Sequence, residues 1–436
     1  MIIPFYHTVK DKISSNSLYK SSFWAVFGNG IGNFLMLISG IFIARTIGKD
    51  LYGEYGMVKT TMYTMATFST LAFGNTSTKF IADYLQKDLS SVKSIVRSAL
   101  WIVLVFSLCM CGLLFLLSEQ IATFVDEPQL ARAFKFLGII IVFRALNTLG
   151  AGILGGFKDF RRVGINNIIA GVVMFSLSIS LTKVWGLTGA YISLISSQVC
   201  LCVLNLWFVY RHQKSITYYS TVSFAKVLFV FSLPFAINEL VYTATTWGNN
   251  MVMTKFASLG ELGMYTACSQ WNSIILFMPG LLGNVILSYL STAASGDRQE
   301  HHTLMKRMLF VNFVSTLIPL IIVMLFANYI ARYYGDSFAG MESVLRLCII
   351  GTLFTCLSRV FDSNLMSSGK RWTAFAICNT FYISSFVAAT IILYKTSGEN
   401  AAMNMMRLSV ILSALMLTVY VIEYRIRYKK AIKVNQ

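Results

Sequence analysis

The feature that most constrains this chain is a succession of apolar runs of about 20 residues, separated by short segments that hold most of the charges. About 20 residues of α-helix cross the ~30 Å hydrocarbon core of a bilayer. Only 12% of the 436 residues are charged, whereas about 25% is usual in a soluble protein. Strands of a membrane barrel would instead be alternating segments of ~10 residues. The runs therefore predict an all-α polytopic membrane protein.

We expect twelve transmembrane helices. The second and eighth are rich in Thr, Ser, Asn and Met, which argues against lipid on all their sides. The spans lie at roughly 22–44, 54–74, 95–117, 131–155, 163–182, 187–210, 227–254, 263–290, 308–330, 342–367, 373–394 and 402–423.

The distribution of cations predicts the orientation. If the N-terminus is cytoplasmic, 23 of the 36 Lys and Arg residues fall in cytoplasmic segments, eight in external segments and five inside spans. Cytoplasmic loops of membrane proteins are rich in Lys and Arg, so both termini should be cytoplasmic. The same rule explains the net charge of +18, which in a soluble protein would point to nucleic acid; here we expect no nucleic-acid partner.

The two halves of the chain repeat each other. Gly53-Glu54-Tyr55 recurs as Gly263-Met264-Tyr265, Gly74-Asn75 recurs as Gly283-Asn284, and Asn166 matches Asn379. Six helices per repeat make both halves enter the membrane in the same direction, as in transporters built from parallel repeats. We therefore expect two pseudo-symmetric six-helix lobes around a central cavity. The predicted parts are a first lobe at 1–210, a cytoplasmic linker at 211–226, a second lobe at 227–424 and a basic cytoplasmic tail at 425–436.

The stretch "ARTIGKDLYGEYG", residues 44–56, is predicted to be the external turn between the first two helices. Gly48 and Gly53 would permit a sharp reversal, and Gly56 would let the second helix pack closely. Arg45 is a candidate gate residue at this turn.

Several motifs resemble a known family. An N-terminal span followed by "IARTIGKDLYGEYG", the turn "GGFKDF…NN" at 155–167 and "WGLTGAYIS" at 185–193 are similar to Wzx-type polysaccharide flippases of the multidrug/oligosaccharidyl-lipid/polysaccharide superfamily. The resemblance covers essentially the whole chain and identifies the substrate poorly. It implies two six-helix bundles around a cavity that opens alternately to each side. It also implies transport of undecaprenyl-diphosphate-linked oligosaccharides from the cytoplasmic to the periplasmic leaflet of the bacterial inner membrane.

Cations inside spans are the first candidates for substrate binding, because each costs a few kcal/mol at the bilayer midplane. Arg144 and Arg359 lie at similar depth in the fourth helix of each lobe, and an Arg pair would suit a diphosphate. Lys59, Arg346 and Arg407 lie about 8–9 Å below the external interface by helical rise. For these three, snorkelling or structural pairing and cavity lining stay open. The predicted diphosphate and cavity residues are Arg144, Arg359, Lys59, Arg407 and Arg346.

Two acids also fall inside spans. Asp362 is three residues from Arg359 on one helix face, so it is either an ion-pair partner or part of a cavity, and like Glu239 it is a candidate counter-ion or ion-coupling residue. Glu239 follows Pro234, which permits a helix bend. Glu239 is either a counter-ion or an ion-coupling residue that binds H⁺ or Na⁺.

Neutral polar side chains are candidates for glycan contact, although helix–helix hydrogen bonding explains such residues equally well. They are Asn29, Asn33 and Asn249. The scattered His and Cys residues predict no metal site, and the chain has no Walker-type motif. We therefore expect no cofactor and no covalent chemistry.

Two alternatives to a flippase remain. A multidrug exporter of the same superfamily would bind an amphiphilic cation and favour acids in its cavity, whereas the spans here hold five cations and two acids. A membrane polymerase or ligase acting on lipid-linked sugars would usually carry an extended external loop. The expected partners are a lipid-linked oligosaccharide, membrane lipids and proteins of polysaccharide assembly, with a monomer as the default state.

Overall fold

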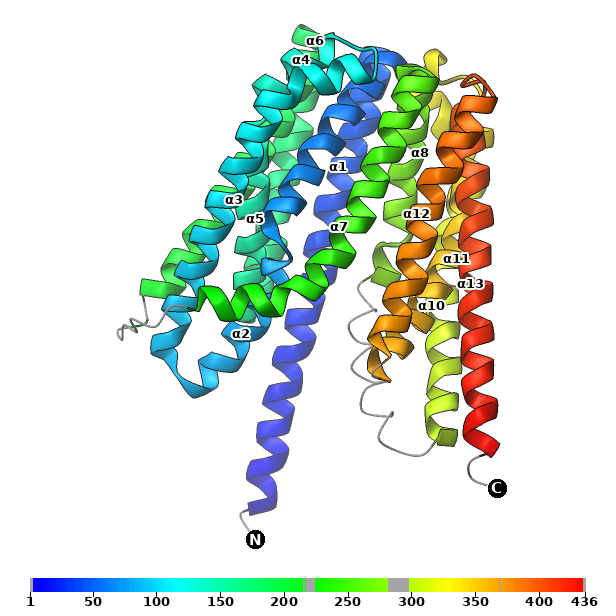
Figure 1. Ribbon diagram of the computed structural model, residues 1–436. Coiled ribbons are helices and arrows are strands. Elements are labelled where there is room, and N and C mark those ends of the chain that lie inside the picture. The colour runs from blue at the N-terminus through cyan, green and yellow to red at the C-terminus, as the bar shows by residue number, and fades with distance from the viewer. Residues whose placement is uncertain (1–2, 215, 217–223, 281–297, 369, 434–436) are drawn as a thin grey trace. The chain divides into compact units, whose positions relative to one another are not determined.

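The computed structural model describes residues 3–214, 216, 224–280, 298–368 and 370–433. In these residues the chain forms α-helices joined by short turns, with one short 3₁₀ helix, η1, and no strand. The predicted all-α membrane fold is confirmed. In chain order the helices are α1 (Ile3–Thr70), α2 (Phe73–Lys87), α3 (Leu89–Phe124), α4 (Gln129–Leu137), α5 (Ile139–Gly156), α6 (Phe160–Lys214), α7 (Ala225–Phe256), α8 (Leu259–Ile275), α10 (Arg298–Tyr334), η1 (Asp336–Phe338), α11 (Met341–Ser367), α12 (Arg371–Lys395) and α13 (Ala401–Lys433) (Figure 1).

Eight helices of the described part are long and apolar enough to cross a membrane, and the bent α7 makes a ninth. Two of the eight, α1 and α6, each contain two predicted spans. The first two spans meet at Gly48 (φ 79°) and the fifth and sixth at Gly186 (φ 54°). Both glycines take a backbone conformation that side chains disfavour. The predicted eighth span begins in α8, and its residues after 280 lie outside the described residues, as does the Gly283-Asn284 repeat motif.

The predicted turn at residues 44–56 is shorter than expected. Of its glycines, only Gly48 leaves the helical conformation, whereas Gly53 lies within regular helix. A reversal of direction at one residue is enough because a single glycine with positive φ breaks the helix. The expectation that Gly53 helps the chain to reverse is wrong.

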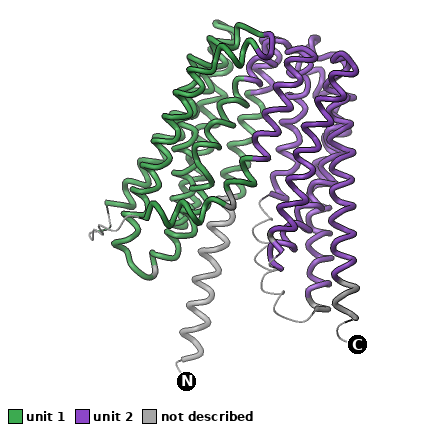
Figure 2. The backbone as a smooth tube through the Cα atoms, in the orientation of Figure 1, with its two compact units in different colours: residues 1–39, 58–123, 127–240 green, residues 40–57, 124–126, 241–436 purple. Residues whose placement is uncertain are grey.

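The contacts divide the chain into two compact units (Figure 2). Unit 1 contains residues 1–39, 58–123 and 127–240, and unit 2 contains residues 40–57, 124–126 and 241–436. The part of α1 around Gly48 belongs to unit 2, and the first half of α7 belongs to unit 1. The predicted lobe boundaries stay a prediction. Helices longer than one span make contacts with different neighbours along their length, so a contact boundary can fall inside a helix.

Unit 1 is held together partly by buried amides. Asn205 donates to Asn147 Oδ1 at 2.6 Å and accepts from Asn166 at 2.8 Å, and all three side chains are buried. These bonds join α5 to both halves of α6. Inside a membrane such hydrogen bonds replace the hydrophobic effect as a source of helix association. The repeat-related Asn379 instead donates within its own helix, to the carbonyl oxygen of Phe375.

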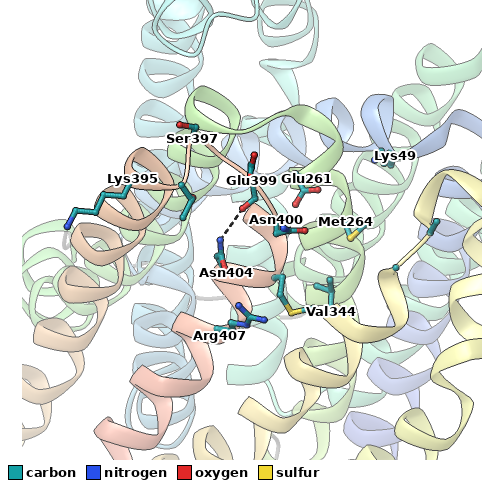
Figure 3. Close-up of a pocket in the computed structure, with 14 residues that line it drawn as sticks. Lys49, Glu261, Met264, Val344, Lys395, Ser397, Glu399, Asn400, Asn404 and Arg407 are labelled. Carbon is teal, nitrogen blue, oxygen red and sulfur yellow. Dashed lines mark hydrogen bonds between the residues drawn. The ribbon is translucent and has the colours of Figure 1, made fainter.

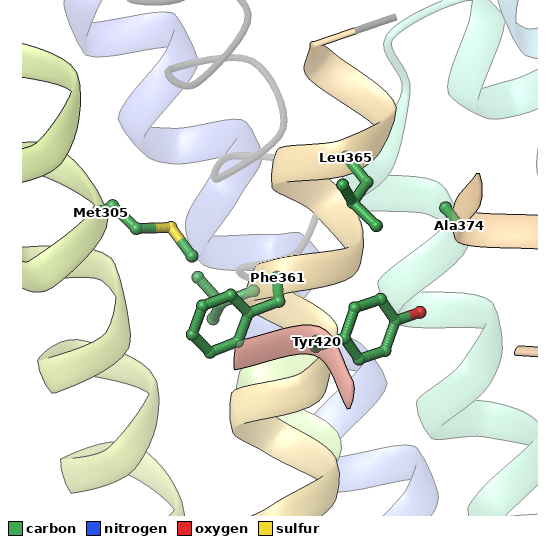
Figure 4. Packing of buried hydrophobic residues seen from close by; sticks show 6 residues of the cluster. Met305, Phe361, Leu365, Ala374 and Tyr420 are labelled. Carbon is green, nitrogen blue, oxygen red and sulfur yellow. The ribbon is translucent and has the colours of Figure 1, made fainter. Parts of the chain in front are cut away.

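Unit 2 is a bundle in which α8, α10, α11, α12 and α13 pack side by side. One buried cluster joins four of these helices: Met305 from α10, Val360, Phe361 and Leu365 from α11, Ala374 from α12 and Tyr420 from α13 (Figure 4). The Tyr420 side chain is only 1% exposed, so its hydroxyl needs a partner inside the bundle.

Candidate functional site

Two of the predicted cations meet in unit 1. Lys59 on α1 and Arg144 on α5 both lie over the ring of Tyr63. The Lys59 Nζ is 5.8 Å and the Arg144 Cζ is 4.4 Å from the centroid of that ring. Because both distances are measured to the same centroid, the charges of Lys59 and Arg144 lie at most roughly 10 Å apart. We call Lys59, Tyr63 and Arg144 the unit 1 cation cluster.

The chemistry of the unit 1 cation cluster favours an anion. The face of an aromatic ring attracts a cation, but it leaves the guanidinium N–H groups of Arg144 free to donate elsewhere. Two like charges held near each other repel, and more so where the effective dielectric constant is low. No ion pair of Arg144 with an acid occurs in the part of the chain that the structure describes. A phosphate-like ligand would relieve this repulsion and satisfy the donors.

Sequence reasoning missed Tyr63. The contact of Tyr63 with Lys59 could have been predicted, because the two residues are four apart and therefore share a helix face. The approach of Arg144 to the same ring was not readable, since it depends on how α1 and α5 are rotated against each other.

In unit 2, Asp362 is bound by groups other than the neighbouring cation. Its Oδ1 accepts a hydrogen bond from the Tyr420 hydroxyl at 2.9 Å, and the Cys378 Sγ lies 3.7 Å from the same oxygen. No ion pair joins Asp362 to Arg359 among the described residues. The Asp362 side chain is therefore held by a hydrogen bond rather than by a close ion pair, and the choice between a counter-ion of Arg359 and a cavity residue stays a prediction. The Tyr420 hydroxyl that donates to Asp362 belongs to a side chain that is buried in the unit 2 bundle.

The three other predicted cations of unit 2 do not come together. Arg359 is exposed, and its guanidinium lies 3.3 Å from where a Cβ of Gly280 would stand. Arg346 is exposed and donates to Asn328 Oδ1 at 3.1 Å. Arg407 lines a cavity at the start of α13, and neither Arg346 nor Arg359 is among the residues that line it. A shared unit 2 site for these cations is absent from the described residues.

Glu239 lies close to a bend in α7. The segments Ala225–Leu233 and Ala236–Phe256 meet at 57°, and the sequence has Pro234 between them. The predicted helix bend is confirmed. The Glu239 side chain is exposed, and α7 passes from unit 1 to unit 2 between Leu240 and Val241.

The predicted glycan-contact residues have different environments. Asn29 accepts a hydrogen bond from Asn167 on α6. Asn33 is exposed. Asn249 is 9% exposed and donates to Ser385 at 3.4 Å, while its own Oδ1 is buried with no hydrogen-bond partner among the described residues. Asn29 thus makes a helix–helix bond, and Asn33 and Asn249 retain hydrogen-bonding capacity.

The predicted gate residue Arg45 is exposed, and its Cγ lies 3.7 Å from where a Cβ of Gly335 would stand. Lys255, which occupies the position of Arg45 in the second sequence repeat, has a clear structural contact. Lys255 donates to the carbonyl oxygen of Phe124 at 2.6 Å and lies 4.3 Å from the centroid of that ring. It therefore fixes the end of α3 to the end of α7, because a cation is favourable beside the last carbonyls of a helix.

The described residues contain no group of three or more His, Cys, Asp or Glu side chains placed to hold a metal ion.

Comparison with known proteins agrees with this architecture. Residues 18–285, more than half of the chain, match the family model described as "Polysaccharide biosynthesis protein". The Shigella flexneri protein named "Putative O-antigen transporter" is 23% identical over 414 residues, which is 92% of this chain and 97% of that protein.

Solved structures share the fold. An inward-facing multidrug resistance transporter of the MATE family and MOP superfamily has a TM-score of 0.81 at 14% identity, covering 93% of this chain and 96% of that one. The lipid II flippase MurJ in an inward closed conformation has a TM-score of 0.68 at 14% identity, covering 93% of this chain and 87% of that one. The resemblance to this superfamily that the motifs indicate is confirmed. The chain is therefore a multi-pass membrane protein that belongs to the family of polysaccharide biosynthesis proteins and has the fold of MOP-superfamily transporters.

Proposed function

We propose that this protein is a flippase that moves undecaprenyl-diphosphate-linked oligosaccharide repeat units from the cytoplasmic to the periplasmic leaflet of the bacterial inner membrane. The product would serve O-antigen or another surface polysaccharide. The family, the transporter relative and the shared fold support this function. The single observation that carries it is the unit 1 cation cluster, in which Lys59 and Arg144 share the ring of Tyr63.

In this proposal the unit 1 cation cluster holds the diphosphate. Arg144 supplies planar, permanently charged donors that can bind two phosphate oxygens at once, and Lys59 adds a second positive charge. Arg359, which is exposed in unit 2, is a separate candidate for phosphate contact. Asn33 and Asn249 are the candidates for hydrogen bonds to the glycan. Transport then needs binding and a conformational change by alternating access, with no covalent chemistry.

The energy source would be an ion gradient or the membrane potential. Asp362 is the better placed of the two acids to carry a coupling H⁺, because its carboxylate is held by the Tyr420 hydroxyl inside the unit 2 bundle. Glu239, beside the bend of α7, is the alternative site for H⁺ or Na⁺. An intramembrane acid that gains and loses a cation is a common element of transport.

The proposed arrangement has both termini in the cytoplasm and one chain as the working unit, in contact with proteins of polysaccharide assembly. Accessibility of single Cys residues introduced beside Lys10 and Lys395, in a variant without the native cysteines, tests the orientation. A membrane-impermeant maleimide added to intact cells should label the position at 395 and spare the position at 10.

Two measurements test the function. A strain that lacks the protein should accumulate lipid-linked repeat units facing the cytoplasm. In proteoliposomes, the purified protein should expose a lipid-linked oligosaccharide to an enzyme added outside, and a variant with Lys59→Ala and Arg144→Ala should not. Unimpaired translocation by that double variant would overturn the proposal.

The multidrug-exporter alternative is tested in the same vesicles. The fold that the chain shares with a MATE-family transporter is compatible with this alternative. A lipophilic cation, however, would be repelled by the positive charges of Lys59 and Arg144. We expect no uptake or release of a fluorescent lipophilic cation under gradients that drive movement of the lipid-linked sugar.

A further inference from the structure

We propose that a cavity at one end of unit 2 binds an acidic sugar, meaning a saccharide that carries a carboxylate or phosphate group. This inference rests on the proposed function, because the acidic sugar would be part of the transported oligosaccharide. The cavity has a volume of about 760 Å³, within the range of roughly 300–1,000 Å³ that is usual for ligand sites. We call it the unit 2 cavity.

The unit 2 cavity is built where several helices of one unit begin or end. Its walls come from the break in α1, the first turns of α8 and α11, the turn that joins α12 to α13, and the first two turns of α13. The lining residues are Lys49, Glu261, Met264, Ala339, Gly340, Val344, Lys395, Thr396, Ser397, Glu399, Asn400, Met403, Asn404 and Arg407 (Figure 3).

The turn between α12 and α13 has a fixed conformation. Ser397 (φ 49°) and Asn400 (φ 50°) both take the left-handed backbone conformation although neither is a glycine. Between them, Gly398 packs so closely that a Cβ would stand 2.1 Å from the carbonyl oxygen of Phe256. Such conformations persist only where surrounding contacts hold them, and they concentrate at ligand sites. The rim of the unit 2 cavity is therefore pre-organised.

Three cations line the unit 2 cavity without an acidic partner. Lys49, Lys395 and Arg407 form no ion pair with a carboxylate anywhere in the described residues. The lining also holds two acids, Glu261 and Glu399. The Glu261 Oε2 accepts the backbone N–H of Ala402 at 2.8 Å and so caps the start of α13. Three cations against two carboxylates leave the lining with a net positive charge, which favours an anionic ligand.

Arg407 is an exposed cation that lines the unit 2 cavity from the second turn of α13. It lies about 9 Å along α13 from the first residue of the helix, by helical rise, below Asn404 and Asn400 (Figure 3). Its guanidinium can bind two oxygens of a carboxylate or phosphate group together. Near it the lining is apolar, with Met264 7% and Val344 4% exposed.

The remaining lining suits a sugar ring rather than a bare anion. The side-chain amides of Asn400 and Asn404 offer donors and acceptors to hydroxyl groups, and Asn404 is oriented by its hydrogen bond to the carbonyl oxygen of Glu399 at 3.0 Å. The apolar wall of Met264, Val344 and Met403 offers a surface for C–H groups. A few oriented polar groups beside an apolar wall are the usual composition of a small-molecule site.

Calorimetric titration of the purified full-length protein in detergent tests the proposal. The probes are glucuronic acid, glucose 1-phosphate, glucose and inorganic phosphate. We expect binding of both acidic sugars, about tenfold weaker binding of each by Arg407→Ala, and little binding of glucose. If inorganic phosphate binds with the same affinity as glucose 1-phosphate, the site recognises only the anionic group, and the sugar part of the proposal is wrong.

Matched variants keep the result interpretable. Arg332→Ala removes an exposed arginine at the end of α10 in the same unit, outside the cavity lining, and should bind as the parent does. Arg407→Lys should recover part of the affinity. Absence of binding by the parent, or equal affinity in the parent and Arg407→Ala, overturns the cavity proposal while transport of lipid-linked sugar persists. Failure of the proposed flippase function would instead be detected as absence of translocation by the parent protein in the proteoliposome assay.

Discussion

Gly53 and Gly263, which occupy equivalent positions in the two sequence repeats, lie against each other where the second half of α1 crosses α8. A Cβ on Gly53 would stand 3.1 Å from the backbone nitrogen of Gly263 and 1.8 Å from the carbonyl oxygen of Leu259. A Cβ on Gly263 would stand 2.0 Å from the carbonyl oxygen of Lys49. The repeated glycines thus allow two helix backbones to touch inside unit 2, as small residues do in membrane helix pairs.

This contact predicts that Gly53→Ala and Gly263→Ala each destabilise the protein. An inserted methyl group must push two backbones apart, and overpacking of this kind costs about 1–3 kcal/mol. Both variants should have a lower Tm than the parent in a thermal-shift measurement on purified protein. Gly112→Ala is the matched control, because its Cβ would meet nothing within 4 Å and alanine favours a helix. A Tm of Gly53→Ala equal to that of Gly112→Ala would contradict the close crossing.

The unit 1 cation cluster predicts a graded set of transport defects. Arg144→Lys keeps the charge and loses the bidentate fork, so it should retain more translocation in proteoliposomes than Arg144→Ala. Loss of a charge-assisted hydrogen bond of about 1.5–3 kcal/mol corresponds to a decrease of roughly ten- to a hundredfold for Arg144→Ala. Tyr63→Phe keeps the ring face and should stay close to the parent, whereas Tyr63→Leu should not. Equal rates for Arg144→Lys and Arg144→Ala would remove the case for diphosphate binding.

The hydrogen bond between Asp362 and Tyr420 predicts where a coupling ion acts. If Asp362 carries the H⁺, then Asp362→Asn should abolish the stimulation of transport by a proton gradient and leave gradient-independent exchange measurable. Tyr420→Phe should shift the pH at which stimulation is half-maximal, because the carboxylate loses its hydroxyl donor. Proton and sodium gradients are imposed separately on the same proteoliposomes. Loss of stimulation in Glu239→Gln with a normal response in Asp362→Asn would assign the coupling to the α7 bend instead.

Asp88, at the start of α3, predicts a pH dependence of stability. The Asp88 carboxylate accepts a hydrogen bond from the Ser91 hydroxyl at 2.5 Å, and from the hydroxyl and backbone N–H of Ser90 at 2.7 and 2.9 Å. These bonds, the Ser91 hydroxyl first, lower the pKa of Asp88 from its usual value. A lowered pKa in the folded state means that the stabilisation is fully present above the unfolded-state pKa. It is lost as the pH falls through the folded-state pKa.

The measurement compares the Tm of Asp88→Ala with that of the parent. Since an aspartate at this position caps the helix, the variant should be less stable at pH 7. The difference should shrink on acidification below the usual pKa range of an aspartate. A difference in Tm that is the same at pH 7 and at pH 3 would show that the carboxylate charge is not what stabilises the start of α3.

The sequence by itself determined that the chain is an all-helical membrane protein. Apolar run length is a local property, and the bilayer admits only structures that satisfy their own backbone hydrogen bonds. The break at Gly48 and the bend beside Glu239 were also readable, because glycine and proline act on the backbone where they stand. The repeat of Gly53 as Gly263 was visible, but its purpose was assigned to a turn.

Only the tertiary structure decided which residues meet. Arg144 joins Lys59 over Tyr63, Asp362 is bound by Tyr420 rather than by Arg359, and Arg407 lines a cavity with two lysines. Spacing along one helix predicts which side chains share a face, but it does not say which neighbouring helix that face contacts. That contact depends on the rotation and crossing point of each helix pair. In a membrane these are set by close packing and hydrogen bonds between helices, which hydropathy does not encode.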